Sequence, residues 1–90
     1  MSEPRYHRHA DIRLTSLEGE GVVLHLKERR YFSVNETGLT LLEALKQPRS
    51  FAELVAEILR EYEVSEETAA LTTRGFLDQC LASAVVQESK

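Results

Sequence analysis

The sequence predicts an α+β domain in which a three-stranded antiparallel sheet is followed by three helices. Apolar residues alternate with polar ones between residues 12 and 34, which is typical of strands. After residue 35 they recur at three- and four-residue spacing, which is typical of helices. The chain has 90 residues, of which 42% are hydrophobic, enough for one modest core and too few for a second. Strands first and helices second favour an α+β domain over an α/β one.

The expected strands are rich in β-branched and aliphatic residues at alternate positions, and they cover residues 12–17, 22–26 and 30–34. Glu18-Gly19-Glu20-Gly21 separates the first two, and Lys27-Glu28-Arg29 has the length of a hairpin turn between the second and third. Residues 1–11 are polar and contain a proline, so we expect a flexible N-terminal arm there. A single domain is then expected over residues 12–87.

Three helices are expected after the last strand, and the first two have clear N-terminal signals. Asn35 is a good N-cap for the first helix, which Pro48 ends. Ser50 and Glu53 have the spacing of a capping box, in which the serine hydroxyl accepts from the N3 amide and the glutamate accepts from the N-cap amide. The apolar stripe that follows, ending at Tyr62, predicts an amphipathic second helix.

Ser65 is the expected cap of a long third helix, with order ending at Val85-Val86. Its inner face is expected to comprise Ala69, Thr73, Phe76, Leu77, Cys80, Leu81 and Ala84. Gly75 lies in its interior, where glycine costs roughly 0.5–1 kcal/mol relative to alanine. That cost suggests a close approach by another backbone, from the sheet or from a bound peptide; a tolerated helix glycine is the alternative.

Charge and composition exclude several classes of protein. The chain carries 11 basic and 15 acidic residues, a net charge of −4. Up to Val34 the balance is six basic against five acidic residues, and after it five against ten, so the helical part has no basic face of the kind that nucleic acids need. The sequence shows no secretory signal and no apolar run long enough for a membrane span. A single cysteine excludes an internal disulfide, so we expect a cytoplasmic protein.

No residue pattern predicts catalysis. His7 and His9 are interpreted as solvated arm residues, because no other metal ligands accompany them. His25 is expected to be structural or exposed, and Cys80, on the apolar stripe of the third helix, to be a core residue. The sequence contains no phosphate-binding glycine loop and no nucleophile elbow. We therefore expect no enzyme activity, no metal site and no cofactor.

The third expected strand, residues 30–34, is the segment that predicts binding. A three-stranded sheet has an edge strand, and an edge beside aromatic side chains can take up an extended peptide by strand addition. Tyr31 and Phe32 are adjacent and so point to opposite faces. One of them is expected to pack against the helices and the other to be available.

Several segments follow one another in an order that is informative: GVVLHL, YFSVNETG, LLEAL, a break at Gln47-Pro48, SFAELVAEILREYEVSEE and FLDQCLASAVV. In this order and spacing they resemble the PqqD-like family, whose members are leader-peptide recognition domains of systems that modify ribosomally made peptides (RiPP recognition elements). The spacing from Val34-Asn35-x-Thr37-Gly38 to Tyr62-x-Val64 is most similar to the small stand-alone members encoded with lasso peptides. Thr72 stands where relatives often have an acidic residue. Ala84 stands where they often have glycine, which suggests a different helix ending.

The resemblance implies a winged-helix-like fold in which the leader of a precursor peptide lies antiparallel along the third strand, in a groove beside the third helix. By position, the strand contributes Arg30, Tyr31, Phe32, Ser33 and Val34. The candidates on the helix are Leu71, Arg74, Gly75 and Asp78.

The leading hypothesis is thus a non-catalytic adaptor, or peptide chaperone, that holds a leader for a separate leader peptidase or other maturation enzyme. A structural subunit of a peptide-modifying enzyme is the first alternative. A winged-helix DNA-binding module is the second, and the acidic third helix disfavours it. An unfilled strand edge can also pair with a second copy of the chain, so a homodimer is a further expectation about assembly.

Overall fold

The computed structural model describes residues 3–89. Its strands are β1 (Arg5–Arg8), β2 (Ile12–Leu17), β3 (Glu20–His25), β4 (Arg30–Val34), β5 (Arg49–Ser50) and β6 (Val86–Ser89). Its helices are α1 (Glu36–Ala44), α2 (Phe51–Glu61) and α3 (Glu66–Ala82). The expected three-stranded antiparallel sheet and three helices are all present. The expected α+β class is therefore confirmed.

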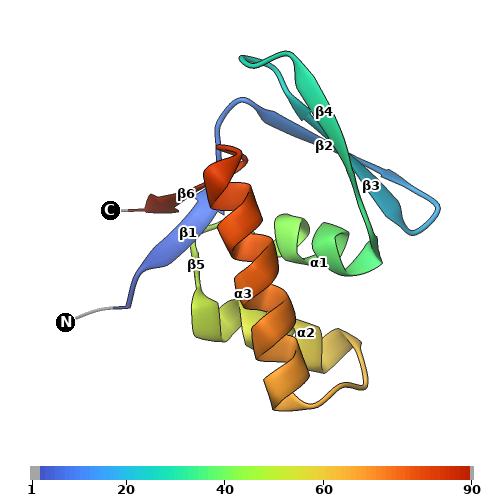
Figure 1. The fold of residues 1–90 in the computed structure, drawn as a ribbon, viewed down its shortest axis with the longest axis vertical. Helices are drawn as coiled ribbons and strands as arrows, with labels where there is room; N and C mark the ends of the chain where they lie inside the picture. The colour runs from blue at the N-terminus through green and yellow to red at the C-terminus, as the bar shows by residue number, and fades with distance from the viewer. Residues whose placement is uncertain (1–2, 90) are drawn as a thin grey trace.

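Strands β2, β3 and β4 form the larger sheet, in that order, and two hairpins connect them. In Figure 1 the sheet lies to one side of the three helices. Successive side chains of each strand point to opposite faces of the sheet. Ile12, Val23 and His25 are buried toward the helices. Leu24 and Tyr31, which oppose one another, are exposed on the other face. One face of this sheet is therefore core, and the other is surface.

Side chains cap all three helices as the sequence predicts. Asn35 Oδ1 accepts from the Gly38 amide at 2.9 Å, and Ser65 Oγ accepts from the Thr68 amide at 3.1 Å. Both hydrogen bonds of the capping box are made at α2, since Ser50 Oγ accepts from the Glu53 amide and the Glu53 carboxylate accepts from the Ser50 amide. These caps fix where each helix begins, because each satisfies amides that have no partner within the helix.

A second sheet overturns the expected flexible arm. Residues Arg5–Arg8 form β1, the central strand of a small antiparallel sheet in the order β5-β1-β6. Tyr6 is buried in the core, and the Arg8 amide donates to the Leu45 carbonyl at 3.0 Å. The segment is polar because only Tyr6 reaches the core, so composition alone did not indicate a strand. Met1 and Ser2, which also belong to the expected arm, lie outside the described residues.

The chain beyond α3 also differs from expectation. Order does not end at Val85-Val86, because β6 pairs with β1 along four residues. Ala84 adopts a left-handed conformation, with φ of 59°, and the Val85 amide donates to the Cys80 carbonyl at 2.9 Å. This is the helix ending that glycine usually provides, so the expectation of a different ending at Ala84 was wrong.

The core joins both sheets to the helices. Its fully buried side chains include Leu41, Leu42, Leu45, Leu54 and Leu77. Tyr6 from β1, Val23 from β3 and Val86 from β6 pack into the same cluster. The two sheets are thereby held around one hydrophobic core.

Candidate functional site: the groove between β4 and α3

Strand β4 is an edge strand of the larger sheet. All five of its residues pair with β3, from Arg30 opposite His25 to Val34 opposite Gly21. No other strand among residues 3–89 pairs with it. In an antiparallel ladder the backbone groups of successive residues face alternate edges, so half of the β4 amides and carbonyls are directed away from β3. The open edge of β4 can therefore accept a further strand.

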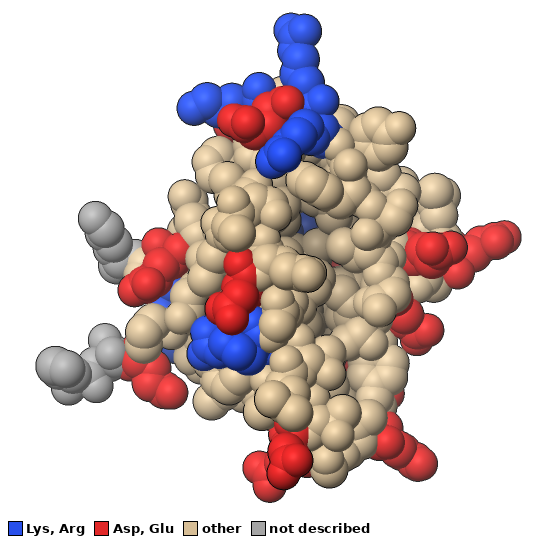
Figure 2. Space-filling view, in the orientation of Figure 1, with Lys and Arg blue, Asp and Glu red and all other residues tan. Residues whose placement is uncertain are grey.

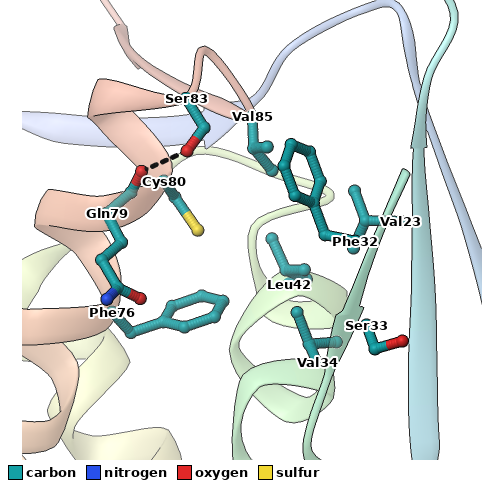
Figure 3. A pocket seen from close by; sticks show the side chains of 10 residues that line it. All are labelled: Val23, Phe32, Ser33, Val34, Leu42, Phe76, Gln79, Cys80, Ser83 and Val85. Atoms are coloured by element: carbon teal, nitrogen blue, oxygen red, sulfur yellow. Dashed lines mark hydrogen bonds between the residues drawn. The ribbon is translucent and has the colours of Figure 1, made fainter. Parts of the chain in front are cut away.

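A cavity of about 170 Å³ lies between β4 and α3 (Figure 3). The residues that line it are Val23, Phe32, Ser33, Val34, Leu42, Phe76, Gln79, Cys80, Ser83 and Val85. Figure 3 shows the side chains of Phe32, Leu42 and Val34 on one side of it and those of Phe76 and Cys80 on the other. None of its lining residues is charged, so the cavity suits an apolar side chain.

The hollow continues toward the start of α1. Asn35, Thr37 and Gly38 line this second part together with Thr72 and Phe76 of α3. Phe76 thus contributes to both parts of the groove. Gly38 has no room for a side chain, because an added Cβ would lie 2.9 Å from Phe76 Cε1 and 3.1 Å from Val34 Cβ. A glycine here is what allows the ring to lie close to α1.

The two aromatic residues of β4 take the different environments that alternation predicts. Phe32 is half-buried against the core, and the Arg30 guanidinium lies 5.4 Å from the centre of its ring. Tyr31 points to the outer face and is 75% exposed. Phe32 and Val34 are therefore directed to the groove, whereas Tyr31 and the hydroxyl of Ser33 face away from it.

The helix residues predicted to face β4 do not line the groove. Leu71 is 68% exposed, and Gly75 and Asp78 are on the exposed surface as well. Arg74 lies with its guanidinium 4.5 Å from the centre of the Phe51 ring of α2 and 3.5 Å from the Asp78 carboxylate. Instead, α3 presents the i, i+3, i+4, i+7 series Phe76, Gln79, Cys80 and Ser83 to β4.

The rotation of α3 was missed because its apolar residues are spread around the helix. A narrow stripe would have fixed the rotation, but Leu71 is apolar and exposed while Thr73 is polar and fully buried. The signal that would have found the groove face is the pair Phe76 and Cys80, which sequence analysis placed on the inner face without extending it to Gln79 and Ser83. An added Cβ at Gly75 meets nothing within 4 Å, so the sheet does not approach this glycine.

Cys80 at the side of the cavity is a buried, neutral thiol. Its side chain is 7% exposed, and burial raises its pKa to about 12. A nucleophilic cysteine needs the opposite shift, toward the thiolate at neutral pH. The expectation that Cys80 is a packing residue is confirmed.

The histidines pack within the structure. His25 is fully buried and its Nδ1 accepts from the Glu28 amide at 3.3 Å. His7 is half-buried and hydrogen-bonds to Ser89 and Gln87 of β6, so its interpretation as a solvated arm residue was wrong. His9 is half-buried too, with its Nδ1 accepting from the Asp11 amide. Within residues 3–89 no three His, Cys, Asp or Glu side chains come together as metal ligands would.

The fold and the groove define a small α+β domain in which the open edge of β4 lies beside a helix. The family described as coenzyme PQQ synthesis protein D (PqqD) matches residues 20–86, and the chain belongs to that family. No curated protein matches the sequence. None of the helices in the described part of the chain has the length and apolar character to cross a membrane.

Two solved structures share the fold. One, described as TbiB1 in complex with the TbiA(beta) leader peptide, is 23% identical with a TM-score of 0.81, and the match covers 90% of this chain and 94% of that one. The other, a lasso peptide synthetase B1 complexed with the leader peptide, is 17% identical with a TM-score of 0.77, covering 91% and 96%. The winged-helix-like arrangement expected from the family is therefore the arrangement of this chain.

Proposed function

We propose that this chain is a non-catalytic leader-peptide recognition element. Its single domain comprises residues 12–87 together with strand β1. This domain would bind the leader of a ribosomally made precursor peptide by strand addition to β4, in the groove beside α3. The observation that carries the proposal is the open edge of β4 next to an uncharged apolar cavity. Membership of the PqqD family supports it, as do the two similar structures, which are described as complexes with leader peptides.

Strand addition divides the recognition between backbone and side chains. The outward amides and carbonyls of β4 supply hydrogen bonds that any extended peptide can make. Alternate residues of the peptide then point toward α3, where the cavity walled by Phe32, Phe76 and Leu42 takes an apolar side chain. A disordered leader loses roughly 2–5 kcal/mol on ordering, and burial of such anchors offsets that cost.

The adaptor would act by tethering. A precursor whose leader is held on β4 keeps its core segment attached and disordered, at roughly millimolar effective concentration for an enzyme bound to the same complex. Chemistry then belongs to a separate maturation enzyme, a leader peptidase or cyclase. The neutral Cys80 thiol and the uncharged lining of the cavity fit a binding role.

A DNA-binding role is less well supported. Between Glu66 and Ala82, α3 has one basic residue, Arg74, and that guanidinium already lies near Asp78 and over Phe51. Glu66 and Glu67 at the start of the helix would repel phosphates. The two roles also predict different responses to salt: DNA affinity would fall steeply as salt rises, whereas leader binding through an apolar groove would change only weakly.

The first test is a fluorescence-anisotropy titration with a labelled synthetic leader, taken from a precursor encoded beside this chain. We expect saturable binding with a Kd below about 10 μM, or roughly −7 kcal/mol. Phe76→Ala, in the groove, should weaken binding at least tenfold, whereas Leu71→Ala, on the exposed side of the same helix, should leave it unchanged. Absence of binding, or equal effects of the two variants, would overturn the proposal.

A second pair of variants separates strand addition from simple insertion of a side chain. Ser33 and Val34 are adjacent in β4, so their amides face opposite edges, and proline removes one amide in each case. The variant that loses the outward amide should weaken leader binding strongly with a small loss of stability. The other should lose a ladder bond to β3 and therefore be less stable. Unchanged leader affinity in both variants would exclude strand addition.

A further inference from the structure

The outer face of the larger sheet, on the side opposite to the helices, carries exposed apolar side chains. Three of them belong to its strands: Leu17 (56%), Leu24 (38%) and Tyr31 (75%). The register places Leu24 between Arg13 of β2 and Tyr31 of β4, so these side chains are neighbours on one face. Leu17 lies farther along the same face, beyond the row of Thr15, Val22 and Ser33.

Charge is distributed unevenly along this face. Arg13 lies on it at one end, next to the β3–β4 turn, which carries the basic Lys27 and Arg29 and the acidic Glu28. Glu20 lies on the same face at the other end, opposite Leu17, next to the β2–β3 turn that carries Glu18. In Figure 2 basic side chains, with acidic atoms among them, gather at the top, where Figure 1 shows the β3–β4 hairpin. Acidic side chains lie at the right, where the β2–β3 hairpin is.

These end charges form no ion pairs. Across residues 3–89, none of Arg13, Lys27, Arg29, Glu18 and Glu20 forms an ion pair. Arg13 Nη1 donates instead to the carbonyls of Ala10 and Ile12, at 3.4 and 3.2 Å. Arg13 and Glu20 are separated along the sheet, since Arg13 opposes Leu24 and Glu20 opposes Leu17. The face therefore has a mainly basic end that carries Leu24 and Tyr31, and an acidic end that carries Leu17.

We propose that this face binds a second copy of the same chain as a two-fold dimer. A two-fold rotation that makes the strands of the two copies antiparallel lays the basic end of each copy on the acidic end of the other. Leu24 and Tyr31 of each copy, which share a row with Arg13, then lie over Leu17 of the other copy. A patch with opposite charges at its two ends is complementary to itself in this way, whereas a partner of one charge sign would match only one end.

The dimer would leave the leader groove free. Phe32 and Val34 point to the helix side of the sheet, and the added strand would lie at the edge of β4, away from the stacked faces. The two copies could thus each hold a peptide. The inference does not depend on the leader-binding proposal, since it concerns the opposite face of the sheet.

The test is sedimentation velocity of the full chain between about 1 and 200 μM. We expect a reversible dimer, with Arg13→Glu and Glu20→Arg each weakening self-association at least tenfold because each places like charges together at both ends. The double variant Arg13→Glu/Glu20→Arg should restore it, since the swap recreates two opposite-charge ends. Circular dichroism checks that each variant is folded.

Three results would overturn the dimer: a monomer at every concentration, a dimer that neither single charge reversal weakens, or single variants that the double variant does not rescue. A monomer that instead binds the maturation enzyme through Arg13 and Tyr31 would assign the face to that enzyme. Leader titrations on the same variants distinguish the two proposals. Self-association can be absent while leader affinity is retained, and leader binding can be absent while self-association is retained.

Discussion

The two sheets of this protein differ in what lies beside their edge strands. In the small sheet, β1 is central, and the edge strands β5 and β6, which come from distant parts of the sequence, have only two and four residues. In the larger sheet, β3 is central, the edge strands are β2 and β4, and β4 has its open edge beside α3 and an apolar cavity. An open edge beside such a cavity offers an extended peptide both backbone hydrogen bonds and a site for a side chain.

The small sheet also helps to position the groove beside the larger one. Strand β5 runs directly into α2, and β6 follows α3 after a short turn, so β1 ties the ends of both helices together. The His9 amide donates to the Val85 carbonyl at 2.9 Å, just after the end of α3. Arg5 of β1 also pairs with Glu53 of α2 at 2.9 Å. The wall of the groove formed by α3 is thereby held in place by the small sheet.

Tyr6→Ala should cause the largest loss of stability. Tyr6 is buried in the core from the central strand of the small sheet, and removing a buried aromatic side chain costs about 3 kcal/mol. For a chain of this size that corresponds to a fall in Tm of roughly 10–20 °C, measured by thermal unfolding. Tyr31→Ala is the matched control, because that ring is 75% exposed, and its Tm should change little. A Tm of Tyr6→Ala that stays near those of Tyr31→Ala and the unaltered protein would show that β1 does not hold the fold together.

The pH dependence of stability should report on the burial of the Cys80 thiol beside the groove. Cys80 has a folded pKa of about 12 against an ordinary value of 9.0, because burial disfavours its thiolate. Between these values the unfolded chain loses the proton and the folded chain keeps it, so stability falls as pH rises above about 9, by up to about 1.4 kcal/mol per unit. Urea unfolding at pH 8, 9.5 and 10.5 measures this. Cys80→Ala should lack that part of the slope, and an identical slope in both proteins would refute the assignment.

Sequence patterns predicted the larger sheet and all three helices because each is a local signal: alternation in β2 to β4, and caps at Asn35, Ser50 and Ser65. They failed on the small sheet, since β1 and β6 are polar strands whose partners are far away in sequence, and pairing over such distances leaves no local pattern. They found the strand side of the groove through Phe32 and Val34. The helix side depends on how α3 is rotated, which its scattered apolar residues do not determine.

Two substitutions should have the smallest effects on stability: glycine to alanine within α3, and alanine to glycine just after its end. Gly75 is helical with open space around it, so Gly75→Ala should stabilise the protein by roughly 0.5–1 kcal/mol. Ala84 follows the helix at a φ of 59°, where Ala84→Gly relieves strain and should also stabilise, by up to about 1 kcal/mol. Differential scanning calorimetry measures both.

Leader titrations on the same two variants then decide what Gly75 is for. If a bound peptide approached the α3 backbone closely there, the methyl group of Gly75→Ala would weaken binding although the protein became more stable. Because Phe76, Gln79, Cys80 and Ser83 form the groove face, and Gly75 lies on the exposed surface beside it, we expect unchanged affinity. A tenfold loss in Gly75→Ala, with Ala84→Gly unaffected, would instead place the peptide farther around α3 than the cavity indicates. The groove would then be wider than its apolar part.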